Sequence, residues 1–126
     1  MRYSIIYNSE MHIIESKIYG DVILSQVKEL IAEYAAIVKE KGCTLIFSDY
    51  RQATIKLSTI EIYELPKIYT DIFALSRLSI YRVKRALVVA EDLKDYLFFE
   101  TVTFNQGQFA KIFKDFTEAR EWLLSK

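Results

Sequence analysis

The sequence predicts an α/β protein, in which helices pack on a mixed, mostly parallel five-stranded sheet. Two observations lead to this prediction. Short runs rich in β-branched and aromatic residues alternate with longer segments of helical periodicity, and such an alternation implies right-handed crossovers between parallel strands. The first two apolar runs are separated by only a few polar residues, so we expect the sheet to begin with an antiparallel hairpin.

The first part of the chain predicts two strands and a helix. "RYSIIY" (2–7) and "MHIIESKIYG" (11–20) are the strands of the hairpin, and the polar residues 8–10 are its turn. Apolar residues then recur from Ile23 to Val38 at helical spacing, and Gly42 is placed to end this helix as its C-terminal cap.

A strand and a long helix follow. "CTLIFSD" (43–49) has no alternation, as expected of a strand covered on both faces. We expect the polar stretch from Asp49 to Thr59 to be a joint between two elements, not a reaction centre. Ser58 and Glu61 have the spacing of a capping box, which predicts a helix to about residue 78. Pro66 lies inside it and predicts a kink near residue 65 or two abutting helices.

The last elements are a strand at 82–90, a helix at 91–104, a strand at 108–113 and a helix at 115–126, with a turn at 105–107. Asp115 and Glu118 have the spacing of a second capping box. The predicted order is therefore β-β-α-β-α-β-α-β-α.

Composition bounds the function. The 126 residues predict one domain, and 17 cationic and 17 anionic side chains cancel, so we expect no nucleic-acid partner. No apolar run approaches the ~20 residues of a membrane span, and the apolar start is too short for a signal peptide, so we expect a cytoplasmic protein. His12 and Cys43 are the sole histidine and cysteine, which excludes a closed zinc site; we expect both to be structural, His12 within a strand, and we expect no metal or cofactor.

Three segments carry a resemblance to a known family: "KIYGDVILSQVKEL" (17–30), "LIFSDYRQA" (45–53) and "KIFKDFTEAREWL" (111–123). With the element order, they resemble the SpoIIAA-like family, relatives of STAS domains that share a broad shape with CRAL-TRIO lipid-exchange domains. The resemblance covers nearly the whole chain and implies a single STAS-like domain over residues 1–126. None of the three segments is a catalytic signature.

The resemblance also implies a regulatory site. In the phosphorylated antagonists of the family, a serine in a D-S-S/T-G turn begins the second main helix and is switched by a partner kinase. The matching stretch here is "KLSTIE" (56–61), with Leu57 and Ile60 in place of the Asp and the Gly. Ser58 and Thr59 are thus candidate phosphoacceptors. The alternative is that Ser58 only caps the helix.

Two polar groups are candidate binding sites. Asp49, Tyr50 and Arg51 leave the carboxyl end of a strand, where ligands of parallel sheets gather. The alternative is that Asp49 accepts hydrogen bonds from loop amides and Arg51 is solvated. "RLSIYRVKRA" (77–86) combines cations with Tyr81, as in single-strand binders, but these cations also suit the guarded entry to an apolar strand.

The second and third predicted helices have more apolar side chains than one sheet can cover, because the four residues at 96–99 go most of the way round a helix. Either these helices pack on each other, or they leave surface for a subunit, another protein or an apolar ligand. We therefore expect a non-catalytic interaction module that self-associates or binds a protein partner. Its expected aromatic anchors are Tyr63, Tyr69, Phe73, Tyr96, Phe98 and Phe99.

Two alternatives remain. One is a carrier or sensor of an apolar small molecule, held between the second and third helices and the sheet. The other is an enzyme, for which only Asp49, Arg51 and His12 are available; without a paired acid or a phosphate loop we assign no catalytic residue.

Overall fold

The computed structural model describes residues 1–90 and 94–125, and of residues 94 and 95 it describes the backbone alone. Its five strands form one sheet in the order β1-β2-β3-β4-β5. β1 and β2 are antiparallel, and the other neighbours are parallel, as the sequence predicts. The strands are β1 (Arg2–Asn8), β2 (Ile13–Val22), β3 (Leu45–Ile55), β4 (Lys84–Val88) and β5 (Phe109–Phe113).

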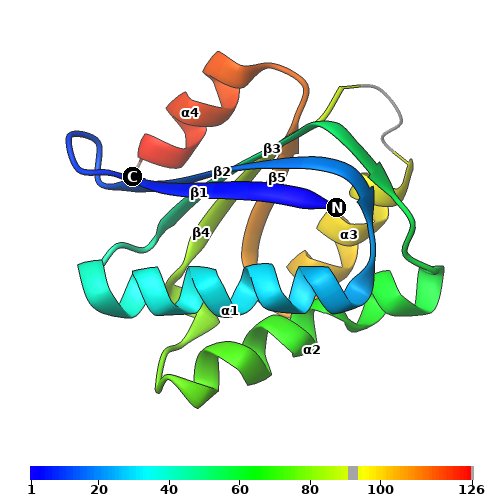
Figure 1. Cartoon of the computed structure of the whole chain (residues 1–126), viewed down its shortest axis with the longest axis horizontal. Helices are drawn as coiled ribbons and strands as arrows, with labels where there is room; N and C mark the ends of the chain where they lie inside the picture. The colour runs from blue at the N-terminus through cyan, green and yellow to red at the C-terminus, as the bar shows by residue number, and fades with distance from the viewer. Residues whose placement is uncertain (91–93, 126) are drawn as a thin grey trace.

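Helices lie on both faces of this sheet, three on one face and α4 on the other (Figure 1). The element order is the predicted one, and the left-handed Gly42 (φ 63°) ends the first helix. The part of the expected third helix at residues 91–93 lies outside the described residues. The helices are α1 (Leu24–Lys41), α2 (Thr59–Leu75), α3 (Lys94–Asn105) and α4 (Phe116–Leu124), with the short 3-10 helix η1 (Ile80–Arg82) before β4.

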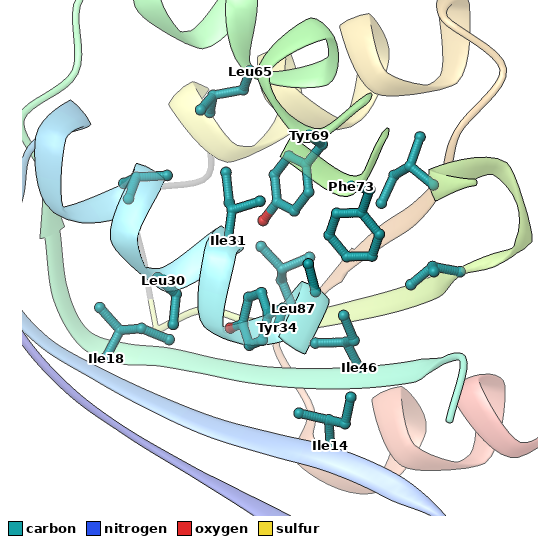
Figure 2. Close-up of a cluster of buried hydrophobic side chains, with 14 of the residues drawn as sticks. Ile14, Ile18, Leu30, Ile31, Tyr34, Ile46, Leu65, Tyr69, Phe73 and Leu87 are labelled. Atoms are coloured by element: carbon teal, nitrogen blue, oxygen red, sulfur yellow. The ribbon is translucent and has the colours of Figure 1, made fainter. Parts of the chain in front are cut away.

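The main core lies between the sheet and the three helices α1, α2 and α3. Figure 2 shows side chains of both α1 and α2 in it, with Ile31 of α1 beside Tyr69 of α2 and Leu30 beside Ile18 of the sheet. A smaller core lies under α4, around residues such as Phe47. Both faces of β3 and β4 are therefore covered, which explains their apolar runs without alternation.

Two predictions of detail were wrong. β3 does not end at Asp49 but continues to Ile55, so most of the expected joint is strand and pairs with β2 alone. His12 lies in the turn before β2, with a positive φ of 56°, and not in a strand. Of the two alternatives for Pro66, two abutting helices are excluded, because α2 is one continuous helix that ends at Leu75; the kink stays a prediction. Within the described residues no helix is long and apolar enough to cross a membrane.

Candidate functional site

The six nominated aromatic anchors differ in exposure. Tyr69, Phe73 and Phe99 are buried in the main core, Tyr96 and Phe98 are partly buried, and Tyr63 is 61% exposed. Burial follows because α2 packs against both α1 and α3, so these helices cover much of their own apolar surplus. Of this set, Tyr63 alone presents most of its side chain to a partner.

A different group of aromatic residues is exposed, at the β5 edge of the sheet. Phe104, Phe109 and Tyr81 are 77%, 56% and 55% exposed, and the partly buried Trp122 lies beside them. We call these four residues the aromatic surface. They come from α3, β5, η1 and α4, so four elements far apart in the sequence build it.

Two hollows, of about 440 and 320 Å³, lie on this surface and share Phe109 and Trp122. The rings of these two residues stack, with centroids 5.9 Å apart and planes at 17°. Phe104 lines the first hollow and Tyr81 the second. The two central rings therefore support each other, and the two hollows lie on either side of them.

Cations surround the aromatic surface. Arg82 and Lys84 line one hollow, and Lys111 lines the other together with Glu100. The Lys84 Nζ lies 4.5 Å from the centroid of the Trp122 ring and donates to the Trp122 carbonyl oxygen, and partial burial lowers the pKa of this amine. Arg82 and Lys111 are exposed, whereas Glu100 is partly buried and accepts from the Ile112 N–H, so the exposed charges that line the two hollows are positive although the whole chain is neutral.

The expected place for an apolar ligand does contain a cavity. It lies between α2, α3 and the sheet, among residues that include Tyr50, Leu65, Tyr69 and Phe99. Its volume is about 40 Å³, against ~150 Å³ for a cavity that binds benzene. In this conformation the cavity has room for a few water molecules at most.

Asp49 and Arg51 form an ion pair on the α4 side of the sheet. The Asp49 Oδ1 accepts from the backbone N–H and Nε of Arg51, both at 3.0 Å, and Oδ2 accepts from Nη2 at 2.8 Å. Burial alone would raise the pKa of Asp49, but the bonds and charge of Arg51 outweigh it and lower the pKa below 3.8. Tyr50 points into the main core, so the three nominated residues do not form one site.

The basic stretch at 77–86 is divided between surface and core. Arg77 and Arg82 are exposed, but Arg85 is buried against the Tyr69 ring, 4.0 Å from its centroid. The cations do not form one continuous row for a phosphate backbone.

Ser58 caps α2, and the capping box is complete. The Ser58 hydroxyl accepts from the Glu61 N–H at 3.1 Å, and the Glu61 carboxylate accepts from the Ser58 N–H at 2.8 Å. Both Ser58 and Thr59 are exposed, so a kinase could reach either hydroxyl.

Cys43 contacts the main chain of His12 and not its imidazole ring. The Cys43 thiol donates to the His12 carbonyl oxygen at 3.0 Å, and burial raises the pKa of this buried thiol. The His12 ring hydrogen-bonds the Tyr7 hydroxyl through Nδ1. In the described part of the chain, no three His, Cys, Asp or Glu residues gather in a way that could hold a metal ion.

The sequence signal for the aromatic surface is weak, because its members come from four elements. Tyr81 stands out only as an aromatic among cations, and Phe104, Phe109 and Trp122 each belong to an ordinary amphipathic or strand pattern. No protein-family model matches this chain, and no curated protein matches it either. Its classification is therefore the one its architecture gives: an α/β fold with a five-stranded mixed sheet.

Proposed function

We propose that this protein is a non-catalytic interaction module that binds another protein through the aromatic surface. One observation carries the proposal: Phe104, Phe109 and Tyr81 are more than half exposed and lie around the stacked Trp122. Large aromatic side chains supply most of the energy of protein interfaces, and isolated domains rarely leave several of them together in water. The interface expected from the sequence was on the second and third helices. The proposed interface includes α3 but not α2, and its other residues come from β5, η1 and α4.

The positive rim argues for a partner with apolar and acidic side chains. Arg82 and Lys111 would lie beside the bound segment, where carboxylates complement them. Pairing of this surface with itself would place cations of both copies in one contact, which costs free energy. The favoured occupant is therefore a different protein and not a second copy of this chain.

Site-specific photo-crosslinking in the protein's native cells tests the proposal. A photo-reactive residue replaces Phe104, whose side chain is exposed, so the substitution should leave the fold intact. In matched controls the photo-reactive residue replaces Tyr63 on α2 or the exposed Lys28 on α1. We expect a discrete crosslinked protein from position 104 that Phe109→Ser abolishes. The same product from position 28, or its persistence with Phe109→Ser, would contradict the proposal.

The affinity is measured with the purified partner through Trp122, which is the sole tryptophan of the chain and belongs to the surface. We expect its emission to shift on binding, and Lys111→Glu to weaken binding of an acidic partner by about tenfold. A partner that binds the Lys111→Glu variant more tightly would mean that its contact segment is basic.

A carrier or sensor of an apolar small molecule is the second candidate, and the cavity between α2, α3 and the sheet is the observation that favours it. At about 40 Å³ the cavity must open before a ligand enters, which requires α3 to move away from α2. Native mass spectrometry of freshly purified protein is the test. A copurified apolar adduct supports the carrier, and its loss in a Leu65→Trp variant would place it in this cavity.

The relation to the SpoIIAA-like family is also a proposal, and the element order and the three segments at 17–30, 45–53 and 111–123 support it. Phosphorylation at Ser58 or Thr59 is part of it, since both hydroxyls are exposed at a helix N-terminus, where added negative charge is favourable. Unchanged partner affinity in the Ser58→Asp and Thr59→Asp variants would remove this regulation.

A further inference from the structure

The two edges of the sheet differ in how they are protected. At the β5 edge, the Ile112 N–H donates to the Glu100 carboxylate at 2.6 Å, so a side chain of α3 occupies an edge position. β1 forms the other edge and is seven residues long. Among the described residues, no side chain hydrogen-bonds to the main chain of β1. An unprotected edge of this length is a template for pairing with another strand.

The hydrogen-bond pattern of β2 shows which groups of β1 face that edge. The Val22 carbonyl oxygen accepts from the Lys56 N–H at 3.0 Å, so the main-chain groups of Val22 point toward β3. Successive residues of a strand point alternately to its two neighbours. The register shift between Lys17 and Tyr19 places its extra residue on β3, so β2 keeps this alternation. The odd-numbered residues of β2, Lys17 and Glu15 among them, therefore point toward β1.

Ser4 and Ile6 are the register partners of Lys17 and Glu15, so the even-numbered residues of β1 bond to β2. The odd-numbered residues direct their N–H and C=O groups away from the sheet. These outward-facing residues are Tyr3, Ile5 and Tyr7.

Charged side chains of α1, the helix beside β1, lie near the tyrosines of this strand. Glu33 and Glu29 lie near the Tyr3 hydroxyl, and the Glu33 carboxylate in particular raises the pKa of Tyr3 to about 12. At the other end of β1, the Lys41 Nζ lies 5.5 Å from the centroid of the Tyr7 ring. Carboxylates therefore lie beside Tyr3 at the start of β1, and Lys41, which also pairs with the neighbouring Glu40 at 3.7 Å, lies beside Tyr7 at its end.

We propose that β1 pairs with β1 of a second copy of this chain, antiparallel and about a two-fold axis through Ile5, which joins the two sheets into one. In this register, Ile5 lies opposite Ile5 of the second copy, and Tyr3 lies opposite Tyr7 of the second copy. In this register all seven residues of β1 have a partner in the second strand, and the two side chains of each pair lie on the same face of the joined sheet. The three pairs of outward-facing residues each form two hydrogen bonds.

The charges select a second copy in this orientation. An antiparallel arrangement brings the start of one β1 beside the end of the other, so Glu33 and Glu29 of one copy face Lys41 of the second copy, and the contact occurs twice. On the same face, Tyr3 beside Glu33 meets Tyr7 beside Lys41, a cross-strand aromatic pair. A parallel arrangement would instead bring like charges together.

This dimer is independent of the proposed function, because β1 and β5 are opposite edges of the sheet. Pairing through β1 leaves the aromatic surface of each copy free at an outer end of the joined sheet. If both proposals hold, the protein is a bivalent module that presents two partner sites, which raises the avidity for a partner with two contact segments.

A charge exchange tests the dimer on the full chain by sedimentation equilibrium. Lys41 and Glu33 are both exposed, so their substitution leaves the core untouched. We expect Lys41→Glu alone and Glu33→Lys alone each to weaken dimerisation by about tenfold or more, because attraction becomes repulsion at two symmetric contacts. The double variant Glu33→Lys/Lys41→Glu restores it. Lys28→Glu, on the same helix, is the matched control and leaves it unchanged.

A backbone substitution gives a second, independent test. Ile5→Pro removes an outward-facing N–H at the two-fold axis and leaves the β1–β2 hydrogen bonds in place, so we expect a folded monomer. Ile6→Pro removes an N–H that bonds to β2, and we expect it to destabilise the fold itself. The proposal is overturned by a monomeric wild type, by a double charge variant no better than the single ones, or by loss of the dimer in Phe104→Ser instead.

Discussion

Arg85 is a buried cation for which no described carboxylate provides a counter-charge. Its Nη2 donates to the Gln108 Oε1 at 2.7 Å, the Tyr69 ring lies against its Cζ, and Nε and Nη1 have no hydrogen-bond acceptor among the described residues. Burial lowers the pKa of Arg85, but a guanidinium remains charged in proteins. Gln108 also donates through Nε2 to the Pro66 carbonyl oxygen at 2.6 Å and to Thr70. One amide thus connects the buried charge to the middle of α2.

The Gln108→Leu variant should therefore be more costly than its size suggests. We expect the free energy of unfolding to fall by about 2–3 kcal/mol, because Arg85 loses its hydrogen-bond acceptor inside the core. Adding Arg85→Met should recover part of the loss, since the uncompensated charge is then gone. Urea unfolding of the single and double variants measures both effects. If the losses of unfolding free energy in the two single variants add up to the loss in the double variant, Gln108 stabilises the protein through α2 and not through Arg85.

The ion pair of Asp49 predicts a pH dependence of stability. At neutral pH we expect Asp49→Asn to lower the free energy of unfolding by only about 1 kcal/mol, because the Arg51 side chain is 45% exposed. The folded-state pKa of Asp49 is lowered, so its contribution is complete above the ordinary value of 3.8 and is lost as the pH falls through the lower folded value.

The measurement is urea unfolding of wild type and Asp49→Asn from pH 7 to pH 3. The difference between them should stay constant down to about pH 5 and then shrink. Asp71→Asn, which breaks the fully exposed pair with Lys67, is the control and should leave the stability nearly unchanged at every pH. A difference that grows toward acid would mean that the pKa of Asp49 is raised in the folded protein.

At the scale of elements, the start of α2 carries a further prediction. Ser58→Ala removes the acceptor for the Glu61 N–H, so we expect a loss of about 1 kcal/mol in thermal or urea unfolding. Ser58→Asp supplies a new acceptor and should keep most of the stability. Thr59→Ala lies one residue further along the helix, caps nothing and should be nearly neutral. Equal losses in Ser58→Ala and Thr59→Ala would assign the effect to the segment and not to the cap.

The strand and helix order could be predicted from the sequence because hydrophobic period and caps are local signals. Gly42 and Ser58 end and begin their helices as expected. The error at β3 arose because its second half pairs with β2 alone, so polar residues appear where a fully buried strand would be apolar. The alternation of Ala53, Ile55 and Leu57 is the period of two that could have extended the strand.

The candidate site was harder to predict for a physical reason. Which aromatic side chains are buried depends on how α2 and α3 pack, and this is a property of several elements at once. Tyr69 and Phe73 become core because α1 covers them, whereas Phe109 stays more than half exposed because β5 is an edge strand and Trp122 of α4 covers only part of its ring. The aromatic residue type alone does not distinguish the two cases.

For the molecule as a whole, net charge and local charge have different consequences. Seventeen charges of each sign give no long-range field, so encounters between copies are not steered over distance. Charges of opposite sign nevertheless lie beside the two tyrosines of β1, with Glu33 near Tyr3 and Lys41 near Tyr7. Charges a few ångströms apart across a contact act within the ~8 Å screening length of physiological salt.

Salt dependence therefore separates the two surfaces through which copies of this chain could associate. For pairing through β1, we expect a rise from about 50 to 500 mM NaCl to weaken the dimer by severalfold and not to abolish it, because the main-chain hydrogen bonds and tyrosine pairs are insensitive to screening. For association through the aromatic surface, the same salt would screen the repulsion between the Arg82 and Lys111 rims and tighten the dimer. Sedimentation equilibrium at both salt concentrations distinguishes the two modes of association. In the double variant Glu33→Gln/Lys41→Gln, dimerisation through β1 should no longer depend on the salt concentration. A dimer that tightens with salt would contradict pairing through β1.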